Sequence, residues 1–119
     1  MINIILWIDD IRDPKDFRKD CNHWPNERVI WCKSVREAIQ AYSLWGSDLE
    51  DEHIRIVEIN IDHDAGNYAA DGGDYIKFLD WMDMQHPEDF KKLHWRIHSM
   101  NPVGIQNMLA VLRRNGVNC

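Results

Sequence analysis

The sequence lacks the features that mark several large classes of protein. Its three cysteines, Cys21, Cys32 and Cys119, show no C-x-x-C spacing, so we expect free thiols rather than a disulfide framework or a structural zinc site. No apolar run approaches the ~20 residues that a membrane-spanning helix needs. The N-terminus has no basic flank ahead of an apolar segment, which argues against a signal peptide. We therefore expect a soluble, cytoplasmic protein.

Positive charge is also scarce. The chain has 14 Lys and Arg residues against 20 Asp and Glu residues, for a formal net charge of -6 at pH 7. A general nucleic-acid-binding protein needs a basic face that replaces the counterions of the phosphate backbone, so the charge argues against that class. Clustered carboxylates instead favour a bound cation.

Three short apolar runs that pass directly into polar residues are the most informative feature of the 119 residues. Residues 4–8 lead into Asp9, Asp10 and Arg12; residues 54–61 lead into Asp62, His63 and Asp64; residues 93–97 lead into His98, Ser99 and Asn101. If the runs are neighbouring parallel strands, their carboxyl ends converge on one crevice, where open α/β sheets bind ligands. Asp9, Asp10, Asp62, Asp64, His98 and Ser99 are then expected to line that crevice.

Helical patterns alternate with the predicted strands. A fourth strand is expected at residues 29–32, from its β-branched and aromatic content. Helices are expected from Ser34, as cap, to Gly46; over Tyr75, Phe78, Leu79 and Met82, ending before Pro87; and from Pro102, capped by Asn101, to Gly116. Residues 15–27 are expected to form a polar loop or one short helix. The chain is therefore expected to be one domain, residues 1–119, with a parallel sheet of about four strands flanked by helices.

The adjacent pair Asp9 and Asp10 has two interpretations. Two carboxylates this close repel each other unless a cation or a proton lies between them, and hard divalent ions prefer oxygen ligands. Alternatively, Asp10 or Asp13 only caps the turn before Pro14. The position of the pair after a buried strand, facing a second acidic segment, favours the metal site.

The segment of Asp62, His63 and Asp64 is a sharper signal. Residues two apart on an extended segment point the same way, so Asp62 and Asp64 could share a ligand, with His63 facing away unless the strand has already ended. Histidine titrates near neutrality and can act as acid, base or ligand. Three ionisable groups at the end of a buried strand carry a heavy desolvation cost, which favours a site over a simple turn.

The third segment has the chemistry of a phosphate-binding turn. A strand that passes into a helix started by Pro102 presents free backbone amides to an anion. Ser99 adds a donor, Asn101 can cap the helix, and His98 can exchange a proton. Ser99 and Asn101 could instead serve only as caps. Arg12 is a further candidate phosphate ligand, although a solvated salt bridge would explain it equally well.

Three motifs in this order resemble those of the cyclic-phosphate-processing receiver-like domain, a divergent relative of the response-regulator receivers. They are Leu6-Trp7-Ile8-Asp9-Asp10-Ile11-Arg12-Asp13-Pro14, Asp62-His63-Asp64-x-Gly66 and His98-Ser99-x-Asn101-Pro102-x-Gly104. The resemblance extends over nearly the whole chain. It implies a three-layer α/β sandwich and the handling of cyclic nucleotides or cyclic-phosphate ends.

By position, the resemblance also implies site roles. Asp9 and Asp10 correspond to the metal-binding acidic pair of receivers, Asp62 to their phospho-acceptor and Ser99 to their hydroxyl residue. Two departures stand out. No fifth strand with the receiver lysine is visible after Ser99, which argues against aspartyl-phosphate signalling, and Ala65 stands where the family commonly has leucine.

Two classes of function remain open. The first is a metal-dependent phosphodiesterase that opens a cyclic phosphate of a small nucleotide or an RNA end. In it, Asp9, Asp10 and Asp62 hold Mg²⁺ or Mn²⁺, His63 or His98, together with Asp64, carries the proton chemistry, and Arg12, Ser99 and Asn101 bind substrate. The second is a non-catalytic receiver-like module that binds a nucleotide or a protein partner. Histidines beside the carboxylates favour the enzyme.

Overall fold

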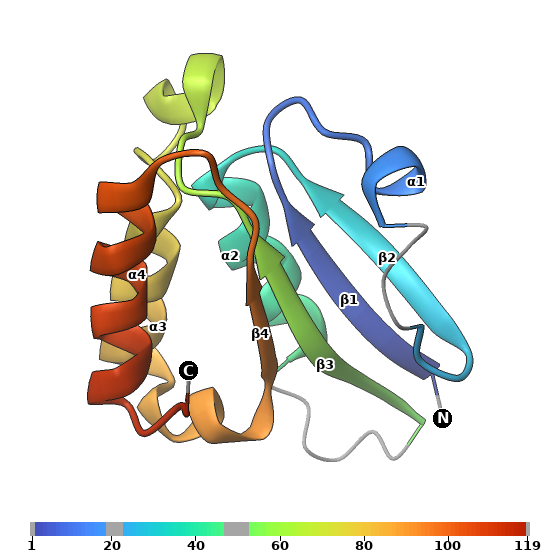
Figure 1. Ribbon diagram of the computed structural model, residues 1–119. Helices are drawn as coiled ribbons and strands as arrows, with labels where there is room; N and C mark the ends of the chain where they lie inside the picture. The colour runs from blue at the N-terminus through green and yellow to red at the C-terminus, as the bar shows by residue number, and fades with distance from the viewer. Residues whose placement is uncertain (1, 19–22, 47–52, 119) are drawn as a thin grey trace.

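Four parallel strands form the centre of the molecule in a computed structural model that describes residues 2–18, 23–46 and 53–118. The strands are β1 (Ile2–Ile8), β2 (Glu27–Cys32), β3 (Ile54–Ile61) and β4 (His94–Ile97), and they lie in the order β2-β1-β3-β4 (Figure 1). The strand order reverses between β1 and β3, and a ligand crevice is expected outside the carboxyl ends of two such strands.

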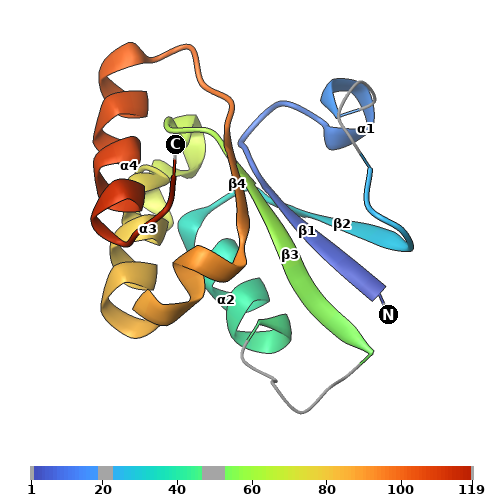
Figure 2. The ribbon, with the colours of Figure 1, turned by 60° about the horizontal axis from the view of Figure 1, so that its bottom comes forward.

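Helices flank this sheet unequally. The helices are α1 (Pro14–Phe17), α2 (Val35–Trp45), α3 (Ile76–Gln85) and α4 (Pro102–Arg114). Figures 1 and 2 show α2, α3 and α4 gathered on one side of the sheet and the short α1 on the other. The predicted parallel sheet flanked by helices is therefore confirmed, although its third layer is thin. Two 3-10 helices, Gly66–Ala70 and Pro87–Lys92, occupy segments in which no helix was predicted.

The helix ends follow the predicted capping residues. The Ser34 hydroxyl accepts a hydrogen bond from the Glu37 amide, and the Asn101 side chain accepts one from the Gly104 amide. Gly116 has a φ of 84° just past the end of α4, a left-handed conformation that glycine adopts without a Cβ clash. The short helix predicted within residues 15–27 is α1, which begins one residue earlier at Pro14 and which Asp13 caps through the Lys15 amide. Residues 19–22 of the predicted segment lie outside the described residues, and Glu27 already belongs to β2.

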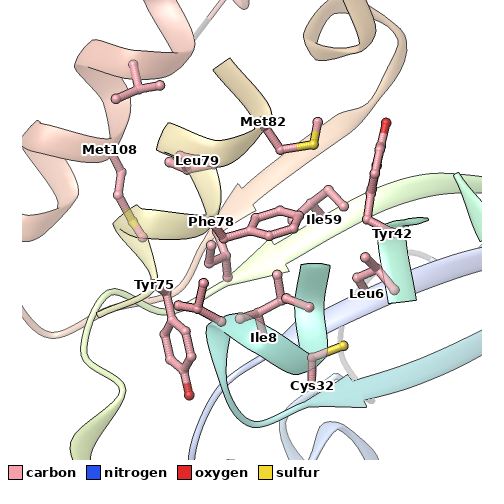
Figure 3. Packing of buried hydrophobic residues seen from close by; sticks show 14 of the residues in the cluster. Leu6, Ile8, Cys32, Tyr42, Ile59, Tyr75, Phe78, Leu79, Met82 and Met108 are labelled. Carbon is pink, nitrogen blue, oxygen red and sulfur yellow. The ribbon is translucent and has the colours of Figure 1, made fainter. Parts of the chain in front are cut away.

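The hydrophobic core lies between the sheet and the three longer helices. Its fully buried members include Leu6, Ile8, Ile59, Tyr75, Phe78, Leu79, Met82 and Met108 (Figure 3). Cys32 belongs to this core as a free thiol, and burial, followed by the charge of Glu37, raises its pKa to about 12. Cys21 and Cys119 lie outside the described residues.

The opposite face of the sheet buries polar residues, and an irregularity in β3 places them there. Ile4 pairs with Ile56, but Ile5 pairs with Glu58, so Val57 is one extra residue in β3. Such a bulge exchanges the two faces for every residue that follows it. Glu58 and Asn60 therefore turn away from the helices, and their residues are only 1% and 2% exposed.

Candidate functional site

Three carboxylates meet where the strand order reverses. Asp9 follows β1 and Asp62 follows β3, and the Asp62 amide donates to the Ile8 carbonyl, which holds the two strand ends together. One oxygen from each of Asp9, Asp10 and Asp62 lies within 4.8 Å of the others. A donor set made only of carboxylate oxygens fits a hard divalent cation such as Mg²⁺ or Mn²⁺.

Asp9 is the fixed member of this cluster, and its side chain is fully buried. Its Oδ1 accepts hydrogen bonds from the Ile11 and Arg12 amides, each at 3.0 Å, and its Oδ2 lies 2.7 Å from His98 Nε2. Burial alone would raise the pKa of Asp9, but the hydrogen bonds from His98 and from the two amides outweigh it and lower the pKa. Asp9 therefore caps the turn after β1 while also facing the cluster.

Asp10 is the member of the cluster whose surroundings disfavour the charged carboxylate. Burial raises its pKa, and the neighbouring carboxylates of Asp9 and Asp62 raise it further. Gly66 permits the close approach of the loop after β3, because a Cβ at this position would collide with the Asp10 carboxylate, and its φ of 55° also suits glycine. This explains a glycine in the motif from Asp62 to Gly66.

Arg12 is the cation that the structure places beside the cluster. Its Nη1 lies 3.7 Å from Asp9 Oδ2 and 3.9 Å from Asp62 Oδ2, and it donates to the His98 carbonyl at 3.3 Å. The side chain is 27% exposed, so part of it can still meet a ligand. Arg12 thus partly neutralises the charge of the acidic cluster.

His98 is held on both sides of its ring. Its Nδ1 lies 2.5 Å from Asn60 Oδ1, and its Nε2 faces Asp9. The ring also stacks on Trp7, with ring centroids 4.3 Å apart. Both nitrogens are therefore engaged within the protein, and His98 is placed to hold Asp9 in position.

The residues behind His98 form a buried polar network that the sequence analysis missed. Asn60 donates to Glu58, which also accepts a hydrogen bond from Trp24 Nε1 and lies 3.6 Å from Arg18. Arg18, 2% exposed, pairs at 2.8 Å with Glu27. The signal in the sequence was the break in alternation at Ile56 and Val57, which marks the bulge in β3.

His63 forms a second group with Asp64 and Asn101. Its Nδ1 lies 2.8 Å from Asp64 Oδ1, and Asn101 Nδ2 lies 3.4 Å from the same oxygen. The hydrogen bond with His63 lowers the pKa of Asp64, and the hydrogen bond with Asn101 lowers it further, while slight burial acts in the opposite direction. Asp64 is therefore ionised at neutral pH. A Cβ at Gly104 would collide with the His63 ring, so this glycine lets the imidazole pack against the start of α4.

The predicted site residues thus lie at one edge of the sheet but in two groups. Asp9, Asp10, Asp62, Arg12 and His98 lie together, while the side chains of His63 and Asp64 form a group with Asp74. The two groups meet at the His63 amide, which donates a hydrogen bond to Asp62 Oδ1 at 2.7 Å. β3 has ended before His63, so this side chain need not face away from its neighbours. Ser99 Oγ accepts a hydrogen bond from the Asn101 amide, and Asn101 caps α4, so both residues have a structural role beside the predicted binding role.

One comparison with known proteins identifies the family of the chain. The model of one protein family, described as the cyclic-phosphate processing receiver domain, matches residues 4–114. The chain belongs to this family. No curated protein and no solved structure matches it.

The match to the cyclic-phosphate processing receiver family includes all three motifs of the site, since it extends over residues 4–114. The four-stranded parallel sheet flanked by helices is receiver-like, and in the described part of the chain no strand follows α4. The same described residues contain no helix long and apolar enough to cross a membrane.

Proposed function

We propose that this protein opens a cyclic phosphate, in a cyclic nucleotide or at a cyclic-phosphate RNA end, by metal-dependent hydrolysis. The observation that carries the proposal is the cluster of Asp9, Asp10 and Asp62 at the strand reversal, with Arg12 beside it. A carboxylate cluster attracts a divalent cation, and a cation next to a guanidinium is suited to a phosphodiester anion. The family description, which names cyclic-phosphate processing, supports the same substrate class.

The residues of the cluster have separable tasks. A divalent ion bound by the three carboxylates would polarise the phosphoryl oxygen and lower the pKa of a water molecule. Arg12 would neutralise charge that develops on the phosphoryl group, and the Ser99 hydroxyl would donate a hydrogen bond to it. His98, fixed by Asn60, would keep Asp9 oriented toward the ion.

Of the two candidate histidines, we expect His63 rather than His98 to carry the proton. In the hydrolysis, a water oxygen bonds to phosphorus, the bond between phosphorus and one ring oxygen breaks, and that oxygen takes up a proton. The hydrogen bonds of His63 use Nδ1, which is directed at Asp64, and leave Nε2 to take or return that proton. This is the relation of a catalytic imidazole to the carboxylate that orients it.

The alternative is a module that binds a nucleotide or a protein partner without turnover. The observation in its favour is His98, because both of its ring nitrogens are engaged within the protein. In that case the carboxylates, Arg12 and the amides at the start of α4 would only hold the ligand.

One incubation distinguishes the two functions. Purified protein is incubated with cyclic mono- and dinucleotides and with 2′,3′-cyclic RNA ends, with and without Mg²⁺ or Mn²⁺, and the products are separated by chromatography. The enzyme is expected to convert at least one compound to a linear phosphate only when metal is present. A compound that binds but returns unaltered with both metals would establish the binding module instead.

Histidine variants then test the proton carrier. His63→Ala is expected to reduce turnover by roughly 10²–10⁴-fold, the usual contribution of general acid-base catalysis, while the affinity for substrate falls much less. His98→Ala is expected to reduce metal affinity first, and excess metal should restore part of its turnover. If His98→Ala lost turnover at saturating metal while His63→Ala kept it, the two roles would be reversed.

A further inference from the structure

A pocket of about 250 Å³ shares Arg12 and His98 with the surroundings of the acidic cluster. It is lined by Trp7, Arg12, Phe17, His98, Ser99 and Met100. It lies between α1 and the segment that joins β4 to α4, so residues far apart in the sequence build it. Arg12, His98 and Ser99 also have roles in the proposed hydrolysis, whereas Trp7, Phe17 and Met100 have none.

The walls of the pocket are suited to a flat ring. Phe17 and Met100 leave 58% and 86% of their surface exposed, although both are apolar. Arg12 places its guanidinium carbon 5.9 Å from the centre of the Phe17 ring, and the stacked pair of Trp7 and His98 also lines the pocket. Aromatic rings and guanidinium planes are the groups on which proteins stack nucleobases.

Arg12 belongs to both the pocket and the phosphate site. The same guanidinium that lines the pocket lies 3.7 Å from Asp9 and 3.9 Å from Asp62. The pocket therefore adjoins the place where the cluster would hold a phosphoryl group, and a ring attached to that group is a suitable occupant.

We infer that the pocket binds the nucleobase that is attached to the cyclic phosphate of the substrate. This inference rests on the proposed function, because the cyclic phosphate must occupy the neighbouring cluster. The base stacks in the pocket beside Phe17, and Arg12 contacts base and phosphate together.

The test compares ligands that differ only in the base. Adenosine cyclic phosphates, as 2′,3′ and 3′,5′ isomers, are compared with methyl ribosides that carry the same cyclic phosphate, in the presence of Mg²⁺ and of Mn²⁺. The readout is the ratio of the two dissociation constants, or of the two kcat/KM values where turnover occurs. The wild type is expected to prefer the adenosine compound by roughly tenfold or more, as stacking on an aromatic side chain provides.

Variants assign this preference to the pocket. Phe17→Ala should bring the ratio close to one, Phe17→Tyr should restore it, and Leu44→Ala, which removes an apolar side chain 67% exposed on α2, should keep it. A wild type that binds both compounds equally would overturn the inference and leave the proposed function intact. Phe17→Ala with an unaltered preference would also overturn it. A wild type that binds neither compound would overturn the proposed function and the inference together.

Discussion

The two faces of the sheet are built on different principles. The face toward α2, α3 and α4 is apolar, with Leu6, Ile8 and Ile59 fully buried among helix side chains. The opposite face buries Glu58 and Asn60. Hydrogen bonds connect Glu58 to Asn60, Asn60 to His98, and His98 to Asp9 of the acidic cluster. Burial of apolar area on the first face stabilises the fold, and hydrogen bonds on the second face fix the position of Asp9. Stability and site geometry are therefore governed by different residues of the same strands.

The largest effect is expected on the apolar face. Phe78 is fully buried within the core, so Phe78→Ala should lower the free energy of unfolding by about 4 kcal/mol, the cost of lost burial and of the cavity left behind. Urea denaturation measures this change. Mg²⁺ is expected to raise the melting temperature of the wild type, and this rise should persist in the fraction of Phe78→Ala that folds, because Phe78 belongs to the hydrophobic core and not to the acidic cluster. A loss of that increase would show that the two faces are not separable.

The polar face should respond to charge instead of volume. Arg18→Met leaves the buried Glu58 without its cation and should lower the free energy of unfolding by about 3 kcal/mol. The double variant with Glu58→Leu removes both charges and should recover part of that loss, since a buried ion pair can be replaced by apolar groups at little cost. Denaturation curves of both variants test this, and a double variant less stable than Arg18→Met would contradict it.

A smaller effect should separate positioning from packing. Asn60→Leu removes the partner of His98 Nδ1 and should weaken Mn²⁺ binding by roughly 10-fold or more, as loss of an outer-shell partner does. Calorimetric titration measures the affinity. The matched control is Asn3→Leu, because Asn3 is buried on the same face but bonds to Pro25 and Arg55. Asn3→Leu should lose stability without losing Mn²⁺ affinity, and equal losses of affinity would mean that Asn60 only packs.

The smallest effects are expected from pH, and they have opposite signs for the adjacent aspartates. The pKa of Asp10 is raised in the folded protein, so its contribution to stability is lost as pH rises through that pKa, and Asp10→Asn should stabilise the metal-free protein above it. The pKa of Asp9 is lowered, so its contribution is present above the unfolded pKa and lost as pH falls through the folded one. Asp9→Asn should therefore destabilise the protein at neutral pH. Denaturation with a chelator present, at a series of pH values, measures both, and equal signs would contradict the account.

The same contrast explains what could be predicted from the sequence. Periodic apolar residues and caps such as Ser34 and Asn101 predicted the helices of the apolar face, because local spacing determines them. The convergence of Asp9 and Asp62 on one edge followed from parallel strands alone. The polar network could not be predicted from the sequence, because it depends on a bulge that adds one residue at Val57 and on long-range hydrogen bonds such as that from Trp24 to Glu58.

The division of the site into two groups could not be predicted from the sequence either. Spacing alone paired Asp62 with Asp64, but the chain leaves β3 after Ile61, and Asp64 turns to His63 and Asn101 instead. The reason for Gly104 is also visible only in three dimensions, where it makes room for an imidazole from another element.

The central claim is that Asp9, Asp10 and Asp62 form a site for a divalent cation, and the most direct test is the melting temperature of the protein with added metal. Millimolar Mg²⁺ or Mn²⁺ should raise the melting temperature of the wild type, as any ligand of the native state does. Asp10→Asn should fold and show little or no such rise. A wild type whose melting temperature is unchanged by either ion, or an Asp10→Asn variant that responds as strongly as the wild type, would contradict the claim.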